Sequence, residues 1–474
     1  GGAVLIGACL IGLCIFGIRG RTGYNPIKVS AAYFCQDAFL NQLGVSPTFN
    51  LLTSVMDDMR PENKYLHLMD EQEAITKAQA LLNRPGDANV SPLAVYRRAA
   101  KADSVQQRRP NVVLIMMESM SAEFMKHFGQ SETLTPFLDS LYTRSISFRN
   151  FYSAGIHTNH GLYATLYSFP AMMKRNLMKG SVIPRYSGLP TVLKENGYYN
   201  LFFMTHEGQY DNMNAFFRTN GYDEVFSQED YPADKVVNSF GVQDDFLYDY
   251  AIPVLNQRAA TGQPFFATLL SISNHPPYVI PPFFHPKTSE PEMQIVEYAD
   301  WALRQFFEEA RKQPWFDNTI FVLEGDHGKL VGDAECELPE SYNHIPLMIS
   351  SSRIQPEEKT TFGGQVDIQP TILGLLNIDY LQNNFGVDLL KEERPCMFYT
   401  ADNMIVGRND TLLYLYNYET QQELTYDIGN GKLNAVPMDD SFLPLKEYSF
   451  SMLQSAEFLV KHGKTVNSVP FTQQ

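Results

Sequence analysis

Three side chains of this 474-residue sequence form the kind of donor set that binds a divalent metal. Glu118 follows one continuous apolar run, and the pair Asp326-His327 follows another. Two carboxylates and an imidazole suit Mn²⁺ or Zn²⁺, with a hydroxyl, water or substrate completing the site. Gly325 and Gly328 flank the pair, and glycines let backbone and ligand approach closely. A cap or a structural loop is the alternative explanation for these residues.

A candidate nucleophile lies in the segment 155–165, which runs from a loop into an apparent helix. Thr158 falls near the N-terminus of that helix, where backbone N–H groups stabilise anionic oxygens. A threonine hydroxyl is a weak nucleophile until it is activated, and metal coordination is one way to activate it. The spacing alone also permits a plain N-cap threonine.

Two more polar groups follow apolar runs of the same kind. His206 comes after the run 199–204, and Asn274-His275 comes after the run 264–271. In open α/β sheets the reactive groups gather beyond the carboxyl ends of the strands. We therefore expect these histidines at the same edge of a sheet as Glu118 and Asp326.

The elements that must position these groups alternate between strand and helix from residue 111 onward. We predict strands at 111–117, 199–204, 264–271, 319–323 and 346–350, and helices at 134–145, 189–196, 292–313 and 366–376. This alternation predicts an α/β fold with a mostly parallel sheet sandwiched by helices. Beyond residue 391 the pattern changes to a small antiparallel subdomain, with short strands at 397–400, 403–406, 411–416 and 423–426 and a helix at 445–461.

The N-terminal segment predicts an attachment to a membrane. Residues 3–17 carry no charge, and Arg19 and Arg21 follow them. The run is slightly short for a full span, so we interpret residues 1–18 as the end of a transmembrane helix. A buried core helix and a signal peptide are the alternatives. We divide the rest into a membrane-proximal helical stalk and linker (19–108), a catalytic domain (109–390) and a C-terminal β-sheet and helix subdomain (391–474).

Composition excludes several classes of protein. Lys and Arg number 37 against 53 Asp and Glu, which gives a net charge of −16. Such an acidic chain is a poor electrostatic match for nucleic acid, so we expect no nucleic-acid partner. The 44% of apolar residues allow a large packed core and exclude a disordered chain. Five cysteines without a C-x-x-C pair exclude a disulfide scaffold.

Several motifs taken together resemble the lipoteichoic acid synthase group of the alkaline-phosphatase/sulfatase superfamily. They are E-S-M (118–120), H-T-N (157–159), S-N-H-P-P-Y (273–278), G-D-H-G (325–328), F-G-G-Q-V-D-I-Q-P-T-I-L (362–373) and F-G-V-D-L-L (385–390). The resemblance covers about residues 111–390 and depends on the order and spacing of the motifs. It implies the superfamily's α/β fold and an enzyme of the cell membrane whose catalytic domain is extracytoplasmic.

The resemblance also implies roles for individual residues. Glu118, Thr158, Asp326 and His327 would bind one divalent metal, Mn²⁺ in the first place and Zn²⁺ or Mg²⁺ as alternatives, with Thr158 as the nucleophile. His275 would assist the leaving group or bind phosphate. We expect the remaining polar positions to bind substrate: Asn159, His206, Asp211 and His344.

One departure affects the choice of substrate. The Trp and Arg that bind glycerophosphate in lipoteichoic acid synthases are replaced here by Met213 and Ala215. The sequence therefore favours a phosphoglycerol or phosphoethanolamine-type transferase, with a phospholipid as head-group donor and a glycan or lipid as acceptor. The intermediate would be a phospho-threonine.

Three other functions stay open from the sequence. A phosphodiester hydrolase would use the same residues with water as the acceptor. A sulfate-ester hydrolase would need a Cys or Ser in a C/S-x-P-x-R motif, and none stands near residue 158. A metal-binding protein without catalysis would need Asp326 but not Thr158.

Overall fold

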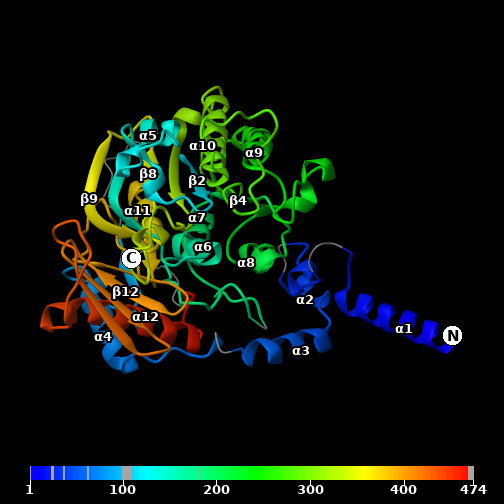
Figure 1. The fold of residues 1–474 in the computed structure, drawn as a ribbon, viewed down its shortest axis with the longest axis horizontal. Coiled ribbons are helices and arrows are strands. Elements are labelled where there is room, and N and C mark those ends of the chain that lie inside the picture. Colours follow the sequence, from blue (N-terminus) through cyan, green and yellow to red (C-terminus); the bar gives the residue numbers. More distant parts are fainter. Residues whose placement is uncertain are drawn as a thin grey trace.

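The computed structural model describes residues 2–22, 26–35, 38–60, 63–98, 109–180 and 182–467. Its centre is an eight-stranded sheet in the order β5-β4-β6-β2-β7-β8-β3-β9 (Figure 1). The strands are β2 (Asn111–Met117), β3 (Ile146–Tyr152), β4 (Tyr199–Met204), β5 (Glu224–Phe226), β6 (Phe265–Leu270), β7 (Thr319–Gly325), β8 (Leu347–Ser350) and β9 (Glu357–Gly364). Only β8 runs antiparallel to its neighbours, so the prediction of a mostly parallel α/β sheet is confirmed.

The central strands are apolar because both of their faces are covered. Every residue of β2, β6 and β7 is buried. Along β2, Val112 and Leu114 join the core on one side of the sheet, and Val113 and Ile115 join the core on the other. This alternation is the two-residue period of a strand, and burial on both faces explains why the sequence shows a continuous apolar run.

Two layers of helices complete the sandwich. One core is closed by α6 (Thr158–Tyr167), α7 (Leu189–Glu195), α8 (Met213–Thr219) and α11 (Ile368–Leu375). The other is closed by α5 (Pro136–Tyr142), α9 (Asp244–Ala259) and α10 (Pro291–Ala310). The first turn of α5 depends on a partner from another helix: the Asp300 carboxylate of α10 accepts bonds from the backbone N–H groups of Phe137 and Leu138, both at 2.9 Å.

A second sheet follows the main one in the chain. It is antiparallel and consists of β11 (Met397–Thr400), β12 (Met404–Arg408), β13 (Leu412–Asn417), β14 (Gln422–Asp427) and β15 (Asn434–Ala435). The long helix α12 (Leu443–Lys461) packs on β11 and β12. The antiparallel sheet expected beyond residue 391 is therefore present.

The segment predicted as a stalk is partly built into the body. Helix α4 (Glu71–Leu82) packs on α12, and β1 (Val95–Arg97) pairs with β10 (Tyr380–Gln382). Residues 99–108, the end of the predicted stalk and linker, lie outside the described residues. The predicted domain boundaries stay predictions.

The N-terminal helices differ from this arrangement. Helix α1 (Gly2–Arg19) is long and apolar enough to cross a membrane, with a mean hydropathy of 2.2, and none of its described residues is buried. Helices α2 (Ala38–Leu43) and α3 (Pro47–Asp58) follow it along the same border of the molecule (Figure 1). The exposure of α1 argues against the alternative of a buried core helix.

Candidate metal centre and nucleophile

The site forms where neighbouring parallel strands end. Strand β2 lies between β6 and β7, and Met117 at the end of β2 is in register with Gly325 at the end of β7. The next residues of the two strands, Glu118 and Asp326, therefore emerge side by side. The backbone supports the pairing, since the N–H of Asp326 donates to the carbonyl of Met117 at 3.0 Å.

Glu118, Asp326 and His327 form a compact cluster. One possible ligand atom from each lies within 4.8 Å of those of the other two. His327 Nε2 is 3.7 Å from Glu118 Oε1 and 3.7 Å from Asp326 Oδ2. Both carboxylate side chains are fully buried. Within the described part of the chain, this is the one group of three or more such residues close enough to hold a metal ion.

Hydrogen bonding leaves one atom of Asp326 and one of His327 suited to a cation. Asp326 Oδ1 accepts bonds from the N–H groups of Ser119 (2.8 Å) and His327 (2.7 Å), whereas Asp326 Oδ2 is buried without a partner. His327 Nδ1 lies 2.8 Å from the carbonyl of Gly328. Since a carbonyl only accepts, Nδ1 carries the proton and Nε2 keeps its lone pair for a ligand bond. The donor set thus fits a divalent metal.

The electrostatics of the cluster agree with this interpretation. Burial, with the nearby Asp326 carboxylate, raises the pKa of Glu118 to about 8. Burial alone would lower the pKa of His327, but Asp326 and Glu118 raise it overall. Buried negative charge of this kind is costly unless it is paired, and a cation is one means of pairing it.

Thr158 is the first residue of α6 and faces the cluster. Its hydroxyl donates to Glu118 Oε2 at 3.4 Å, a long hydrogen bond. The helix dipole at this end favours negative charge, such as that of an attacking oxygen or a phosphate. The prediction that Thr158 lies near a helix N-terminus agrees with this geometry.

The surrounding backbone holds these groups in place. Ser119 adopts a left-handed conformation (φ 49°), and its hydroxyl donates to Glu118 Oε1 at 2.6 Å. Gly161 of α6 lies so close to the carbonyl oxygen of Asp326 that a Cβ atom there would overlap it. Only glycine therefore lets α6 carry Thr158 this near to the Asp326 loop.

Gln365 is a positioning residue that sequence reasoning missed. Its side chain is fully buried; Nε2 donates to the carbonyl of Asp326 at 2.7 Å, and Oε1 accepts from the N–H of Ala154 at 2.9 Å. It thus ties the loop before Thr158 to the loop of the metal cluster. In the sequence, Gln365 stands out only as part of the motif at 362–373, and that motif does not indicate what the side chain does.

His275 lies beside the cluster with one ring nitrogen engaged. Its Nδ1 is 2.6 Å from the carbonyl of Pro276, which leaves Nε2 for a substrate group. Burial lowers its pKa. The neighbouring Asn274 donates to the carbonyl of Ser119 at 3.0 Å and accepts from Lys329 Nζ at 2.6 Å. Lys329, which the sequence analysis did not single out, adds a cationic group two residues beyond His327.

The predicted substrate-binding residues divide into two groups. Asn159, Asp211 and His206 lie on the α6 side of the site: Asn159 donates to Asp211 Oδ2 at 3.4 Å, and the buried His206 ring lies 4.7 Å from that of Tyr210. Burial lowers the pKa of His206. Asp211 also pairs with Lys179 at 2.9 Å.

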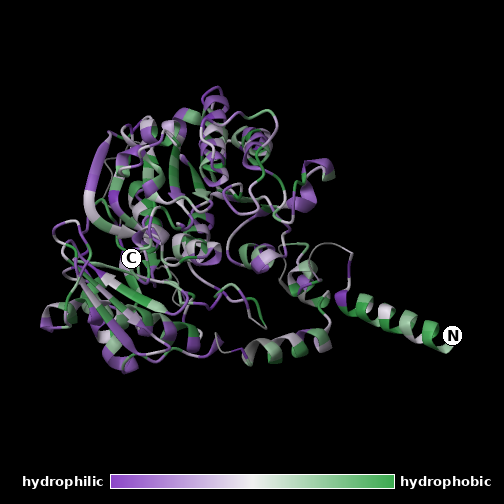
Figure 2. Cartoon of the chain, in the orientation of Figure 1, coloured by the Kyte–Doolittle hydropathy of each residue, from purple (hydrophilic) through white to green (hydrophobic). Residues whose placement is uncertain are grey.

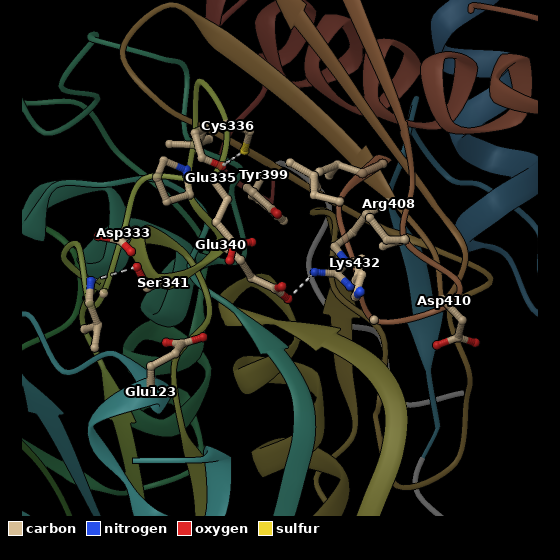
Figure 3. Close-up of a pocket in the computed structure, with 18 residues that line it drawn as sticks. Glu123, Asp333, Glu335, Cys336, Glu340, Ser341, Tyr399, Arg408, Asp410 and Lys432 are labelled. Carbon is tan, nitrogen blue, oxygen red and sulfur yellow. Dashed lines mark hydrogen bonds and ion pairs between the residues drawn. The ribbon is translucent and has the colours of Figure 1, made fainter. Parts of the chain in front are cut away.

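His344 lies apart from that group. Its Nδ1 is 2.8 Å from Glu123 Oε1 and its Nε2 is 2.8 Å from the carbonyl of Arg149, so both ring nitrogens have partners. No described contact places it against a substrate, and its substrate-binding role stays a prediction without support. Glu123 also lines a cavity of about 420 Å³ between the loop around Glu340 and the antiparallel sheet (Figure 3). None of the predicted site residues lines that cavity.

Comparisons with known proteins agree with this geometry. The family described as Sulfatase matches residues 110–378. Lipoteichoic acid synthase 1 of Bacillus subtilis is 25% identical over 350 residues, covering 68% of this chain and 53% of that protein. The lipoteichoic acid synthase of Staphylococcus saprophyticus is 24% identical over 367 residues, covering 70% of this chain and 54% of that protein. The chain thus spans about half the length of these relatives.

Solved structures show the same fold. An alkaline phosphatase superfamily protein from Vibrio parahaemolyticus aligns with a TM-score of 0.75 and 26% identity, over 86% of this chain and all of that one. The lipoteichoic acid synthase LtaP from Listeria monocytogenes aligns with a TM-score of 0.65 and 21% identity, over 75% and 93%. The resemblance expected from the motifs is confirmed: the chain belongs to the sulfatase family, within the alkaline phosphatase superfamily.

Proposed function

We propose that this chain is a metal-dependent transferase that moves a phosphoglycerol or phosphoethanolamine-type head group from a phospholipid to a glycan or lipid acceptor. The observation that carries the proposal is the Thr158 hydroxyl, which lies at a helix N-terminus and contacts Glu118 of the Glu118–Asp326–His327 cluster. The similarity to lipoteichoic acid synthases supports a transferase.

Glu118, Asp326, His327 and Thr158 would hold one divalent cation, with Mn²⁺ proposed and Zn²⁺ or Mg²⁺ as alternatives. A bound cation would lower the pKa of the Thr158 hydroxyl and neutralise charge on the phosphoryl oxygens. Asp326 offers the unpartnered oxygen, and the Gly328 carbonyl fixes the tautomer of His327 that leaves Nε2 available. The N–H of Ser119 holds the Asp326 carboxylate in position, and the Gln365 side chain holds the Asp326 backbone.

The reaction proposed for these residues has two steps. The Thr158 oxygen attacks the head-group phosphorus in line, and the bond from phosphorus to the diacylglycerol oxygen breaks. That oxygen leaves with a proton, and a phospho-threonine ester remains. In the second step an acceptor hydroxyl attacks the same phosphorus and restores the Thr158 hydroxyl. His275, whose Nε2 has no described partner, would exchange the proton in either step.

Intact-mass spectrometry of the full chain, incubated with Mn²⁺ and one phospholipid at a time, tests this function. We expect an adduct of glycerophosphate or phosphoethanolamine mass, and its absence in Thr158→Ala. Thr158→Ser is the matched control, since it keeps a hydroxyl at the same position and should still form the adduct. An adduct of the same yield in Thr158→Ala would refute Thr158 as the nucleophile.

The same experiment separates the proposal from the other functions. A hydrolase would release the head group into water even when acceptor is present, which product analysis detects. A non-catalytic metal protein would bind Mn²⁺ without an adduct or product from any lipid. We further propose that the chain is anchored through its N-terminal helix in the cell membrane, with the catalytic domain extracytoplasmic; the length and hydropathy of α1 support the anchor.

A further inference from the structure

The chain turns back on itself directly after α1. Gly20 adopts a left-handed conformation (φ 76°), and a Cβ atom there would overlap the side chain of Ile27. The N–H of Ile27 donates to the carbonyl of Arg19 at 2.9 Å, which closes the turn. Helix α1 is apolar until its last residue, and hydrophilic residues mark its junction with the body (Figure 2). The residues on either side of the turn therefore reach the same part of the body.

Two contacts join this turn to residues 206–212, a part of the connection between β4 and α8 that we call the His206 loop. Arg21 Nη2 donates to Glu207 Oε1 at 2.7 Å. The N–H of Lys28 donates to Gln209 Oε1 at 3.1 Å. Gln209 Nε2 in turn donates to Glu207 Oε2 at 3.0 Å. The two side chains of the loop are thus bonded to each other and to both sides of the turn.

Burial of the Glu207 carboxylate makes its ion pair more than a surface contact. The Glu207 side chain is only 4% exposed, and that of Arg21 is 30% exposed. A buried carboxylate is costly unless a cation and hydrogen-bond donors compensate its charge, whereas an exposed ion pair contributes little. Arg21 supplies such a cation, so its replacement would disturb the part of the loop that Glu207 holds.

The same N-terminal segment continues along α8, the helix that follows the His206 loop. Asn214 of α8 donates through Nδ2 to the carbonyl of Tyr33 at 2.8 Å. The 3₁₀ helix Val29–Ala32 packs on α8 as well. Residues 21–33 thus contact both the loop and the helix that supports its far end.

The His206 loop depends on such contacts because part of its backbone is left-handed. Asp211 and Asn212 have φ of 47° and 67°, and conformations of this kind persist where the surrounding structure holds them. His206 Nδ1 is 3.1 Å from the carbonyl of Glu207, and the N–H of Tyr210 donates to the same carbonyl at 3.0 Å. The ring of His206 and the turn that leads to Asp211 are therefore both fixed through Glu207.

We propose that the Arg21–Glu207 ion pair positions the His206 loop for the head group of the donor lipid. The segment joined to α1 then forms part of the substrate site, and the loop is in place only when that segment is seated against it. Arg21 and Glu207 are positioning residues, which act through His206 and Asp211 rather than on the reacting atoms. This inference rests on the proposed function, because His206 and Asp211 are expected to bind the head group that is transferred.

Hydrogen exchange of the full chain in lipid nanodiscs tests the positioning without any reaction. In Arg21→Gln we expect the backbone amides of residues 206–212 to exchange about tenfold faster, the effect of losing one hydrogen bond to a charged group. The amides of residues 325–328 should exchange as in the wild type. Arg84→Gln is the matched control, because it breaks the ion pair of a similarly exposed arginine with Glu392, at 2.5 Å, and should leave the His206 loop unchanged. Exchange of the loop that is unchanged in Arg21→Gln would overturn the proposal.

The lipid dependence of adduct formation tests the consequence for the substrate. With phosphatidylglycerol or phosphatidylethanolamine as donor, Arg21→Gln should raise the lipid content for the half-maximal rate about tenfold and leave the maximal rate unchanged. Displacement of a binding group by about 1 Å can cost about 100-fold, so a smaller shift of the loop accounts for this effect. Arg21→Lys keeps the cation and should restore most of the wild-type behaviour.

Glu207→Gln separates positioning from simple attraction between the chain and the lipid. It changes the net charge in the opposite direction to Arg21→Gln, yet it breaks the same ion pair and should shift the half-maximal lipid content in the same direction. The double variant should show no further shift, because both changes remove one interaction. Shifts of opposite sign in the two single variants would overturn the proposal.

The outcomes also separate this inference from the proposed function. An adduct that forms in Arg21→Gln at the wild-type half-maximal lipid content would overturn the inference and leave the function intact. A wild-type chain that forms no adduct with either lipid would refute the function, and with it the head group assigned to the loop. The exchange rates would then still decide whether the ion pair holds the loop.

Discussion

Replacing the buried amide of Gln365 should weaken metal binding without touching a metal ligand. The side chain joins the carbonyl of Asp326 to the N–H of Ala154, which precedes Thr158 by four residues. Gln365→Met keeps the length of the side chain but leaves both backbone groups buried without that partner. Each such group costs about 1–3 kcal/mol, so we expect the two together to lower the free energy of unfolding by about 2–6 kcal/mol.

The effect on the metal follows from the same two bonds. Groups that orient a ligand without touching the metal typically contribute 10- to 100-fold in affinity, or about 1.4–2.8 kcal/mol. We therefore expect the Mn²⁺ dissociation constant of Gln365→Met to rise by about 10- to 100-fold. Calorimetric titration of the detergent-solubilised chain with Mn²⁺ measures this constant, and urea unfolding measures the stability.

Gln454 provides a matched control in another part of the molecule. It is also a buried glutamine with a bond to the backbone, since its Oε1 accepts from the N–H of Leu68 at 2.7 Å. Gln454→Met should lower stability and leave Mn²⁺ affinity unchanged. If Gln365→Met binds Mn²⁺ as tightly as the wild type, although it loses stability as Gln454→Met does, the positioning role of Gln365 is refuted.

Three further predictions follow from contacts described in the structure. Gly161→Ala should lower Mn²⁺ affinity at least about tenfold by pushing α6 away from the metal cluster, and calorimetry that shows no change would contradict the close packing. Arg394→Met should cost about 3–5 kcal/mol in urea unfolding, because it leaves the buried carboxylate of Asp367, bonded at 2.9 and 3.1 Å, without its cation. Burial alone would lower the pKa of His344, but Glu123 raises it above 6.5, so its stabilising contribution is full below pH 6.5 and is lost as pH rises through the raised pKa. His344→Gln should flatten the decline in stability above pH 6.5, and an unchanged profile in thermal unfolding would rule out this linkage.

The sequence predicts the centre of the sheet better than its edges. The continuous apolar runs of β2, β6 and β7 are readable because both faces of these strands are buried. Strand β9 was not predicted, since its first half is polar and exposed, as expected for an edge strand. Strand β3 was missed because Arg149 and Asn150 interrupt its apolar pattern, although the strand is paired on both sides.

In the candidate site, too, the sequence identified the residues that a local pattern marks and missed the one whose role depends on distant partners. Glu118, Asp326 and His327 were identified because they lie one to four residues beyond the ends of two apolar runs, and the topology of the sheet brings such positions together. Gln365 could not be assigned a role in this way, since its partners lie about 40 and 210 positions away in the chain. A buried amide gives no local pattern that reveals which backbone groups it joins.

The contact between α4 and α12 joins the beginning of the folded body to its end. The N–H of Leu66 donates to Glu457, and that of Leu68 to Gln454. During synthesis the segment before α4 therefore has no partner until nearly four hundred further residues have been made. Tension applied through α1 would first act on the segment that carries His206, because Arg21 pairs with Glu207 at 2.7 Å and the N–H of Lys28 donates to Gln209 Oε1 at 3.1 Å. The contacts with α12 would carry that load only after these nearer ones had broken.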